Sequence, residues 1–282
     1  MTRPIILSYV QARPILEARR KGLPSIEVSP DLGLTMVVVS IRPEGVVFPS
    51  GEQPGWKSIE KICKSTVNCF VVEHDGVRPI QVFSETTNRV CSLMPTEKAP
   101  SMLIAGFVMH RIKDIDPYAD TLRKIAAIAP VVGQMLDTAT GLGYTAIEAA
   151  RTAEEVVTIE IDPAVQEVTR LNPWSQGLFD NPKIRQVMGD AFEVVQTFED
   201  QSFSRIIHDP PTFSLAGELY SGEFYRQMFR VLKRGGRLFH YVGDPNSKAS
   251  GGVTRGVIRR LREAGFARVV RRPEAFGLVA YK

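Results

Sequence analysis

The segment "SRIIHDPPTF" at residues 204–213 places several reactive groups directly after an apolar run that is typical of a buried strand. These groups are an imidazole, a carboxylate, two prolines and an aromatic ring, from His208, Asp209, Pro210, Pro211 and Phe213. The Asp209 carboxylate and the Pro210 carbonyl could accept both N–H bonds of one planar amino group. Because proline fixes φ near about −65°, the direction of that carbonyl is set before any substrate binds.

The chemistry that this pair favours is alkylation of an amino nitrogen. Holding both hydrogens helps the nitrogen to turn its lone pair toward an electrophilic methyl group on a sulfonium. Such a transfer needs alignment and electrostatics more than a strong base, and Asp209 or water could take the departing proton. Phe213 or His208 could stack on a base turned out of its helix. The alternative is a turn without chemistry, because Asp-Pro-Pro forms a good turn by itself.

A second chemical signal lies in "MLDTATGLGYTAIEAA" (135–150), which predicts a strand, a glycine loop and a helix. Gly141 and Gly143 permit a close backbone approach that side chains would block. Ala146 stands where a dinucleotide-binding loop has its third glycine. The next two predicted strands end in acids, which are Glu160, Asp162 and Asp190. Since parallel strands end at one edge of a sheet, these groups predict a ligand site there.

The motifs D-x-A-x-G-x-G at 137–143, E-I-D at 160–162 and G-D-A at 189–191 resemble those of class I S-adenosylmethionine-dependent methyltransferases. The resemblance covers about residues 115–282 and implies S-adenosyl-L-methionine as the cofactor. It assigns the methionine part to the first motif, the ribose to the second and the adenine to the third. The residues that we expect to bind the cofactor are Asp137, Thr140, Gly141, Gly143, Tyr144, Glu160, Asp162, Asp190 and Ala191. Asp162 could instead cap the helix after Pro163.

The Asp209-Pro210-Pro211 segment resembles the [DNS]-P-P-[YFW] motif of methyltransferases that act on exocyclic amino groups, although Thr212 delays the aromatic residue by one position. The layout with "MHR", "DPPTFS" and "LYS" is similar to an archaeal group of predicted RNA methyltransferases. We therefore expect an RNA methyltransferase that acts on a base amine, with cytidine N4 in ribosomal RNA preferred. Further side chains expected to contact substrate, with structural packing as the alternative, are His110, Arg111, His240 and Tyr241.

Two other functions compete with this one. The segment from His208 through "LYSGEFYRQMF" also resembles spermidine synthases, which transfer an aminopropyl group from decarboxylated S-adenosylmethionine to a polyamine. A cationic polyamine needs several carboxylates, and only Glu218 and Glu223 follow the motif closely. The third possibility is a non-catalytic RNA-binding module, against which the acids at three strand ends count.

The elements needed to position these groups follow from the hydrophobic pattern. Residues 1–100 predict a small β-rich domain, interrupted by one helix at "WKSIEKICKS", with a possible role in recognising RNA or substrate. Residues 101–116 are expected to link it to a catalytic domain over 117–282 and to line the active site. That domain starts with a helix whose apolar face is expected at Leu122, Ile125, Ala126 and Ala129. Strands and helices then alternate, which predicts an α/β, Rossmann-like fold with a seven-stranded, mainly parallel sheet and helices on both faces. The last two strands suit a hairpin at the edge.

Charge and composition limit the partners. The chain of 282 residues has a net charge of +4, with its basic excess in residues 1–24 and 251–282. This distribution suits contact with RNA, and solvated helix faces are the alternative. No apolar run is long enough for a membrane span and no signal sequence is evident, so we expect a cytoplasmic protein. The three cysteines lack metal spacing, so no metal site is expected. The oligomeric state does not follow from the sequence.

Overall fold

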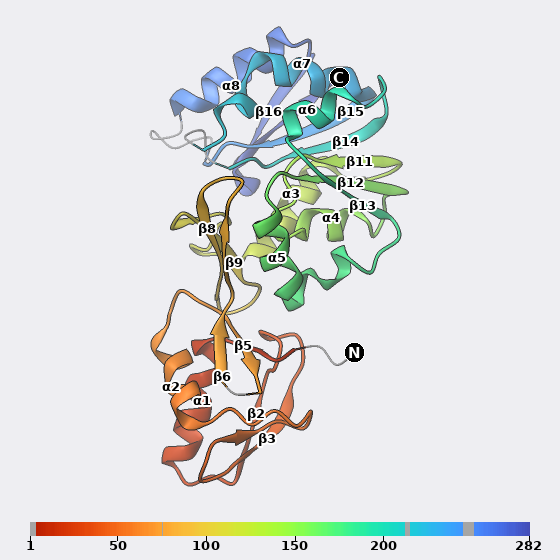
Figure 1. Cartoon of the computed structure of the whole chain (residues 1–282). Helices are drawn as coiled ribbons and strands as arrows, with labels where there is room; N and C mark the ends of the chain where they lie inside the picture. The colour runs from red at the N-terminus through yellow and green to blue at the C-terminus, as the bar shows by residue number, and fades with distance from the viewer. Residues whose placement is uncertain (1–3, 75, 212–214, 245–250) are drawn as a thin grey trace. The chain divides into compact units, whose positions relative to one another are not determined.

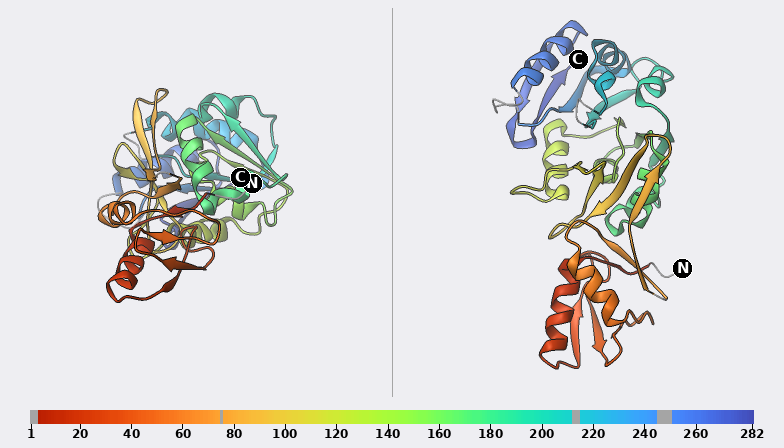
Figure 2. Two further views of the ribbon diagram at one scale, coloured as in Figure 1. Left: turned by 60° about the horizontal axis from the view of Figure 1, so that its bottom comes forward. Right: turned by 60° about the vertical axis from the view of Figure 1, so that its left-hand side comes forward.

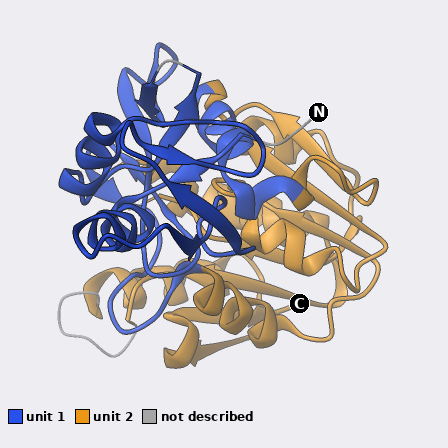
Figure 3. Cartoon of the chain, turned by 90° about the horizontal axis from the view of Figure 1, so that it is seen from below, with its two compact units in different colours: residues 1–117, 164–176 blue, residues 118–163, 177–282 orange. Residues whose placement is uncertain are grey.

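The computed structural model describes residues 4–74, 76–211, 215–244 and 251–282. Within it the chain forms two compact units, which Figure 3 shows in different colours. Unit 1 comprises residues 1–117 and 164–176, and unit 2 comprises residues 118–163 and 177–282. None of the helices in the described ranges is long and apolar enough to cross a membrane.

Unit 2 is built on one seven-stranded sheet (Figure 1). Its strands, in spatial order, are β13 (Ile184–Met188), β12 (Glu155–Glu160), β11 (Gln134–Asp137), β14 (Phe203–His208), β15 (Leu232–Tyr241), β17 (Gly277–Tyr281) and β16 (Arg268–Arg272). The first five strands run parallel, whereas β17 is antiparallel to both of its neighbours. The sheet is therefore mixed: of these seven strands β17 is the one antiparallel strand, and the others are parallel as expected. The connection η3 (Pro273–Ala275) is too short for a crossover, so β16 and β17 form the hairpin that was predicted.

Helices cover both faces of this sheet. The helices α3 (Pro117–Ile128) and α4 (Tyr144–Ala149) share one buried core with the sheet, and α6 (Ala191–Gln196), α7 (Gly222–Val231) and α8 (Gly251–Glu263) share another. Adjacent strand residues alternate between these cores, as Ile206 and Ile207 of β14 do. This two-residue period is what a strand buried on both faces requires. The short helix η2 (Gly217–Tyr220) leads into α7.

Unit 1 contains three small antiparallel sheets. They are formed by β1 (Ile6–Leu7), β5 (Phe70–Glu73) and β6 (Gly76–Pro79), by β2 (Ser25–Val28), β3 (Val37–Ile41) and β4 (Val46–Val47), and by β10 (Phe107–Val108), β9 (Ser101–Ile104), β8 (Arg89–Met94) and β7 (Gln81–Ser84). The segment 164–176, from α5 (Pro163–Leu171) and η1 (Pro173–Leu178), belongs to this unit as well. There the Trp174 indole donates a hydrogen bond of 3.1 Å to the Leu32 carbonyl.

Two helices of unit 1, α1 (Tyr9–Arg20) and α2 (Trp56–Lys64), lie side by side, as the two side views in Figures 1 and 2 show. The sequence predicted only α2. Pro14 lies inside α1 and argues against a helix, because proline cannot donate the bond that an interior position needs. The overlooked signal is a capping box at the start of α1. The Ser8 side chain accepts backbone N–H groups of the first turn, and the Gln11 side chain accepts the Ser8 N–H.

Candidate functional site

Four acids occupy the carboxyl edge of the unit 2 sheet, and we call them the acid row: Asp190, Glu160, Asp137 and Asp209. Glu160 and Asp137 are the last residues of β12 and β11, Asp209 directly follows β14, and Asp190 follows β13 by two residues. Because these four strands are parallel neighbours, all four acids lie at one edge of the sheet. The strand order thus confirms the prediction that these acids share one edge. Their roles in binding a ligand stay predictions.

The glycine loop after β11 passes along this edge. Gly141 has a φ of +51° and Gly143 a φ of +74°, which other residues rarely adopt. A Cβ on Gly143 would lie 2.7 Å from a methyl carbon of Leu178, so this position also lacks room for a side chain. A Cβ on Gly141 would meet no described atom within 4 Å. The protein therefore leaves space over the Gly141 backbone, and a ligand could approach it there.

Glu160 ties the loop to the neighbouring strand. Its Oε2 accepts the Gly141 N–H at 3.0 Å, and its Oε1 accepts the Asp162 N–H at 3.1 Å. Burial raises the Glu160 pKa to about 7, although these two hydrogen bonds act in the opposite direction. Each carboxylate oxygen has a second lone pair, which suits a pair of ligand hydroxyl groups such as those of a ribose. The residues present thus fit a nucleoside at this position.

Asp137 is a buried acid with neutral hydrogen-bond partners. The Thr145 hydroxyl donates to its Oδ2 at 2.6 Å, and the Ala139 N–H lies 3.4 Å from its Oδ1. Burial raises the Asp137 pKa to about 7, and the charge of Asp209 raises it further against these hydrogen bonds. The Asp137 side chain is itself enclosed, but its charge would stabilise a cation at the adjoining sheet edge without direct contact, so the site fits a sulfonium or an ammonium group better than a phosphate.

The remaining residues predicted to bind cofactor take supporting positions. Asp190 caps α6, since its Oδ1 accepts the Phe192 N–H at 2.8 Å, and Ala191 is the first residue of that helix. The Thr140 hydroxyl lies 2.7 Å from that of Thr158 on β12. The buried Tyr144 ring meets the Tyr118 ring edge to face, with 6.2 Å between their centroids. Asp162 is buried, and its N–H donates a hydrogen bond to the Glu160 carboxylate.

A buried lysine that the sequence analysis did not single out binds the acid of the Asp-Pro-Pro segment. The Lys124 Nζ lies 2.6 Å from Asp209 Oδ2 and 3.1 Å from Asp120 Oδ2, and 4.8 Å from the centroid of the Tyr241 ring. Burial opposes the charge on Lys124, but the two carboxylates outweigh it and hold the Lys124 pKa above its ordinary value. Burial also raises the Asp209 pKa, which the Lys124 ammonium counteracts.

This lysine corrects the predicted orientation of α3. The helix was expected to bury Leu122 and Ala126, but both are exposed and the buried face carries Asp120, Lys124 and Ile128. On the inner face of α3 the ion pair of Asp120 and Lys124 takes the place of apolar side chains. The spacing of the apolar residues could not predict this pair. The available signal was the Asp120–Lys124 spacing of four residues, which places an acid and a base on one side of a helix.

Two histidines lie paired behind the acid row. His208 on β14 and His240 on β15 are directly opposite in register, are fully buried and have ring centroids 4.4 Å apart. The His208 Nδ1 lies 2.7 Å from the Thr138 hydroxyl and its Nε2 lies 2.9 Å from the Leu219 carbonyl. Burial lowers the His208 pKa to about 3, against the Leu219 hydrogen bond. A neutral ring that donates from Nε2 and accepts at Nδ1 satisfies both contacts, so His208 fits a positioning role better than the predicted catalytic one.

His240 shares this buried position. Its Nε2 lies 2.9 Å from the Tyr225 hydroxyl, and burial lowers the His240 pKa well below its ordinary value, with the nearby His208 ring acting in the same direction. The substrate contact predicted for His240 is thus not favoured by its placement, because the whole side chain is enclosed. Its neighbour Tyr241 instead contacts the Lys124 ammonium at the site.

Tyr220 is a further group at the site that the sequence left as packing. Its hydroxyl donates to the Pro211 carbonyl at 3.0 Å, which ties η2 to the Asp-Pro-Pro segment. Burial raises the Tyr220 pKa, and the negative charge of Asp209 adds to the shift. Pro210 is also buried. Phe213, predicted to stack on a base, lies outside the described residues.

The other predicted substrate residues belong to unit 1. The His110 Nδ1 lies 3.1 Å from the Ser101 hydroxyl, which also accepts the His110 N–H at 3.3 Å. His110 is therefore held by β9 within its own unit, with Arg111 next in the chain. Their contact with a substrate remains a prediction, as does the predicted role of residues 101–116 in lining the active site.

Sequence comparisons now connect the chain with known proteins. It is 40% identical to the uncharacterized protein MJ1233 of Methanocaldococcus jannaschii, over all of this chain and 98% of that protein. Residues 121–259 match the spermine/spermidine synthase domain. A polyamine aminopropyltransferase of Mycobacterium tuberculosis is 33% identical over 120 residues, but this segment covers only 40% of this chain and 23% of that enzyme. One from Aeropyrum pernix is 35% identical over 30% of this chain and 29% of the enzyme.

Structural comparison agrees on the fold. A crystal structure of spermidine synthase with the transition-state analogue AdoDATO superimposes with a TM-score of 0.57 at 21% identity, covering 71% of this chain and 72% of that one. The spermidine synthase of Thermotoga maritima gives a TM-score of 0.54 at 21% identity, covering 71% of each chain. At these identities the likeness shows the fold alone, a Rossmann-like α/β fold that this chain shares with the two spermidine synthases.

These matches overturn one expectation. RNA methylation at a base amine, with cytidine N4 in ribosomal RNA as target, is wrong, because the domain match and the curated relatives both point to aminopropyl transfer. The Asp-Pro-Pro segment misled the prediction because holding an amine before a sulfonium is a task that both reactions share. The matches support an enzyme that uses a substrate related to S-adenosylmethionine.

Proposed function

We propose that this protein transfers an aminopropyl group from decarboxylated S-adenosylmethionine to an amine nitrogen. The chain belongs to the family of the M. jannaschii protein MJ1233, and its residues 121–259 match the spermine/spermidine synthase domain. The observation that carries this proposal is the pairing of Asp209 with Lys124 within the acid row. In this pairing a fixed, partly buried carboxylate lies at the same sheet edge as Glu160 and the open Gly141 backbone, which fit a nucleoside.

The donor would supply an electrophilic carbon bound to a positively charged sulfur. Glu160 and the open backbone at Gly141 suit its nucleoside, and the ionised form of Asp137 suits its positive charge. In the transfer, a bond forms between the amine nitrogen and that carbon while the carbon–sulfur bond breaks. The sulfur keeps the electron pair and leaves as the neutral thioether 5′-methylthioadenosine.

Asp209 has the features required to prepare the amine. An amine attacks only as the free base, so a proton must leave its nitrogen before or during the transfer. The raised Asp209 pKa makes this carboxylate a better proton acceptor than an ordinary aspartate, and Lys124 fixes one of its oxygens. The second oxygen could then accept an N–H bond of the amine, with a proton passing to it or to water.

Lys124 also suggests which amines fit. A resident ammonium already lies against Asp209, so part of its negative charge is neutralised. A long polyamine with several charges needs more free carboxylates than one neutralised aspartate provides. We therefore propose a small monoamine or diamine as the acceptor.

The experiment is a transfer assay on the full chain. Decarboxylated S-adenosylmethionine is offered with propylamine, putrescine or spermidine, and mass spectrometry follows 5′-methylthioadenosine and the aminopropylated amine. We expect both products with propylamine or putrescine and less with spermidine. Asp209→Asn should remove the activity, while Glu193→Gln on the exposed side of α6 should keep it. Absence of 5′-methylthioadenosine with every amine would overturn the proposal.

A further inference from the structure

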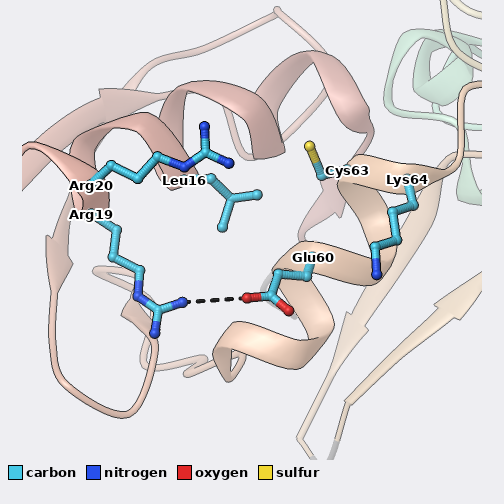
Figure 4. Close-up of a pocket in the computed structure, with 6 residues that line it drawn as sticks. All are labelled: Leu16, Arg19, Arg20, Glu60, Cys63 and Lys64. Atoms are coloured by element: carbon cyan, nitrogen blue, oxygen red, sulfur yellow. Dashed lines mark hydrogen bonds and ion pairs between the residues drawn. The ribbon is translucent and has the colours of Figure 1, made fainter.

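A hollow of about 520 Å³ lies between α1 and α2 of unit 1, and the function proposed above makes no use of it. Figure 4 shows its lining, in which three side chains from each helix face the space. They are Leu16, Arg19 and Arg20 from α1, and Glu60, Cys63 and Lys64 from α2. The volume is within the range of about 300–1,000 Å³ that is usual for ligand sites.

The two helices around the hollow carry an excess of positive charge, and three of the cations, Arg19, Arg20 and Lys64, line the hollow itself with one acid, Glu60. Residues 9–21 and 56–64, which form the two helices and the cap of α1, carry seven basic and two acidic side chains, a net charge of +5. Arg19 is held in place, because it lies 3.4 Å from Glu60 and its guanidinium carbon lies 4.3 Å from the centre of the Trp56 ring (Figure 4). Arg20 and Lys64 are exposed and form no ion pair with another of the described residues. Two cations thus remain for a ligand.

The positive charge also repeats along α2. Lys57, Lys61 and Lys64 are separated by four and three residues, so they follow one side of the helix, and all three are exposed. A single small anion would need only one cluster of cations. A row of cations that continues beyond the hollow suits a chain with regularly repeated negative charges. The two arginines add guanidinium groups, which can bind phosphate oxygens through two hydrogen bonds.

We propose that the hollow between α1 and α2 binds the phosphate backbone of a nucleic acid, with Arg20 and Lys64 as the principal contacts. Leu16 and Cys63 form an apolar part of the lining, against which a sugar or base could pack. Because this surface is formed within unit 1, the proposal does not depend on the reaction proposed for unit 2, and either could fail without the other.

The test measures binding of a fluorescently labelled single-stranded RNA to the full chain by anisotropy, at several salt concentrations. Binding should weaken steeply between roughly 50 and 200 mM salt, as counterion release requires. In Arg20→Ala/Lys64→Ala the slope of log affinity against log salt should fall by about 1.4 to 1.8, since each phosphate contact contributes about 0.7 to 0.9. The affinity at low salt should fall about tenfold or more.

A matched variant separates the site from net charge. Lys98→Ala/Lys233→Ala removes two exposed cations outside the hollow and should retain most of the binding. Equal losses in the two double variants would overturn the site, as would absence of RNA binding by the natural chain. Competition by inorganic phosphate or by an acidic peptide as effective as unlabelled RNA would show a simpler anion site and would also contradict the proposal. Unchanged thermal melting of both variants checks that the helices, whose last turns Arg20 and Lys64 occupy, remain folded.

Discussion

The acid row of unit 2 and the basic hollow of unit 1 use charge in opposite ways. In unit 2, Asp137 and Lys124 are almost wholly buried, each with fixed hydrogen-bond partners, and burial raises the pKa of Asp137, Glu160 and Asp209. In unit 1, Arg20 and Lys64 are exposed to solvent. Buried charges are costly and must be positioned, which suits chemistry on one small group. Exposed charges stay solvated, so they cost little free energy, and they act over a distance, which suits the attraction of a large polyanion.

The largest effect is expected at the acid that meets both the lysine and the substrate. Asp209→Asn should lower the rate of aminopropyl transfer by about 10²–10⁴-fold, because the proton acceptor is lost. Binding of 5′-methylthioadenosine, measured by calorimetry, should stay within a few-fold of the natural chain. Arg20→Ala in unit 1 should leave the transfer rate unchanged. Loss of nucleoside binding in Asp209→Asn would show that this acid belongs to the donor pocket instead.

The second prediction concerns stability. Lys124→Met leaves Asp120 and Asp209 close together without their cation, so the free energy of unfolding should fall by about 3–5 kcal/mol. Denaturant melts should show part of this loss restored in Lys124→Met/Asp120→Asn, which removes one of the two stranded charges. The exposed Lys233→Met should change stability by less than about 0.5 kcal/mol. If Lys124→Met proved as stable as Lys233→Met, the buried ion pair would have no structural importance.

The third prediction tests the nucleoside pocket. Glu160→Gln replaces one accepting oxygen by an amide nitrogen, so the Gly141 N–H or a ligand hydroxyl loses its partner. The affinity for 5′-methylthioadenosine should weaken by about 1–3 kcal/mol in calorimetry. Glu155→Gln, at the start of the same strand, is the control and should bind normally. Equal affinities for the two variants would exclude Glu160 from the pocket.

The smallest effect is a pH dependence. The Asp137 pKa is about 7, so the acid is largely neutral below this pH and ionised above it. Affinity for a cationic sulfonium nucleoside should therefore rise between about pH 6 and pH 8, with a smaller rise in Asp137→Asn. The residual rise in that variant belongs to Glu160, whose pKa is also about 7. The neutral 5′-methylthioadenosine should show a weaker dependence, and a steep rise for it would contradict a charge effect at Asp137.

The same shift has a consequence for folding. A folded-state pKa raised above the ordinary value of 3.8 means that the folded chain holds the Asp137 proton more tightly than the unfolded chain. This contribution to stability is present at low pH and is lost as the pH rises through about 7. Thermal melts from about pH 5 to pH 8 should therefore show a smaller pH-dependent fall for Asp137→Asn than for the natural chain.

Much of unit 2 was predictable because its signals are local. Apolar runs bounded by turns predicted seven strands, and a strand followed at once by glycines or an acid placed these groups at the sheet edge. The antiparallel β17 was also predictable, as part of the hairpin that it forms with β16. In unit 1, α1 was missed because Pro14 contradicts the helical pattern, and only the capping residues revealed the start of the helix.

The functional error has a different origin. The Asp-Pro-Pro segment indicates how an amine is held. Methyl transfer and aminopropyl transfer both use a sulfonium donor and a similar fold, so this segment fits either reaction. A fold and a short motif therefore do not specify which group is transferred. The match of residues 121–259 to the spermine/spermidine synthase domain supplied the information that the motif lacked.

By itself the sequence determined the order of strands and helices in unit 2, the glycine loop and the acids at the strand ends, because each of these depends on residues only a few positions apart. Only the tertiary structure decided that Lys124 is turned inward onto Asp209, 85 residues farther along the chain, and that His208 is enclosed with both nitrogens engaged. The physical reason is that the buried Lys124 ammonium is stabilised by the opposite charges of Asp120 and Asp209. Where such partners lie depends on how separate strands and helices pack.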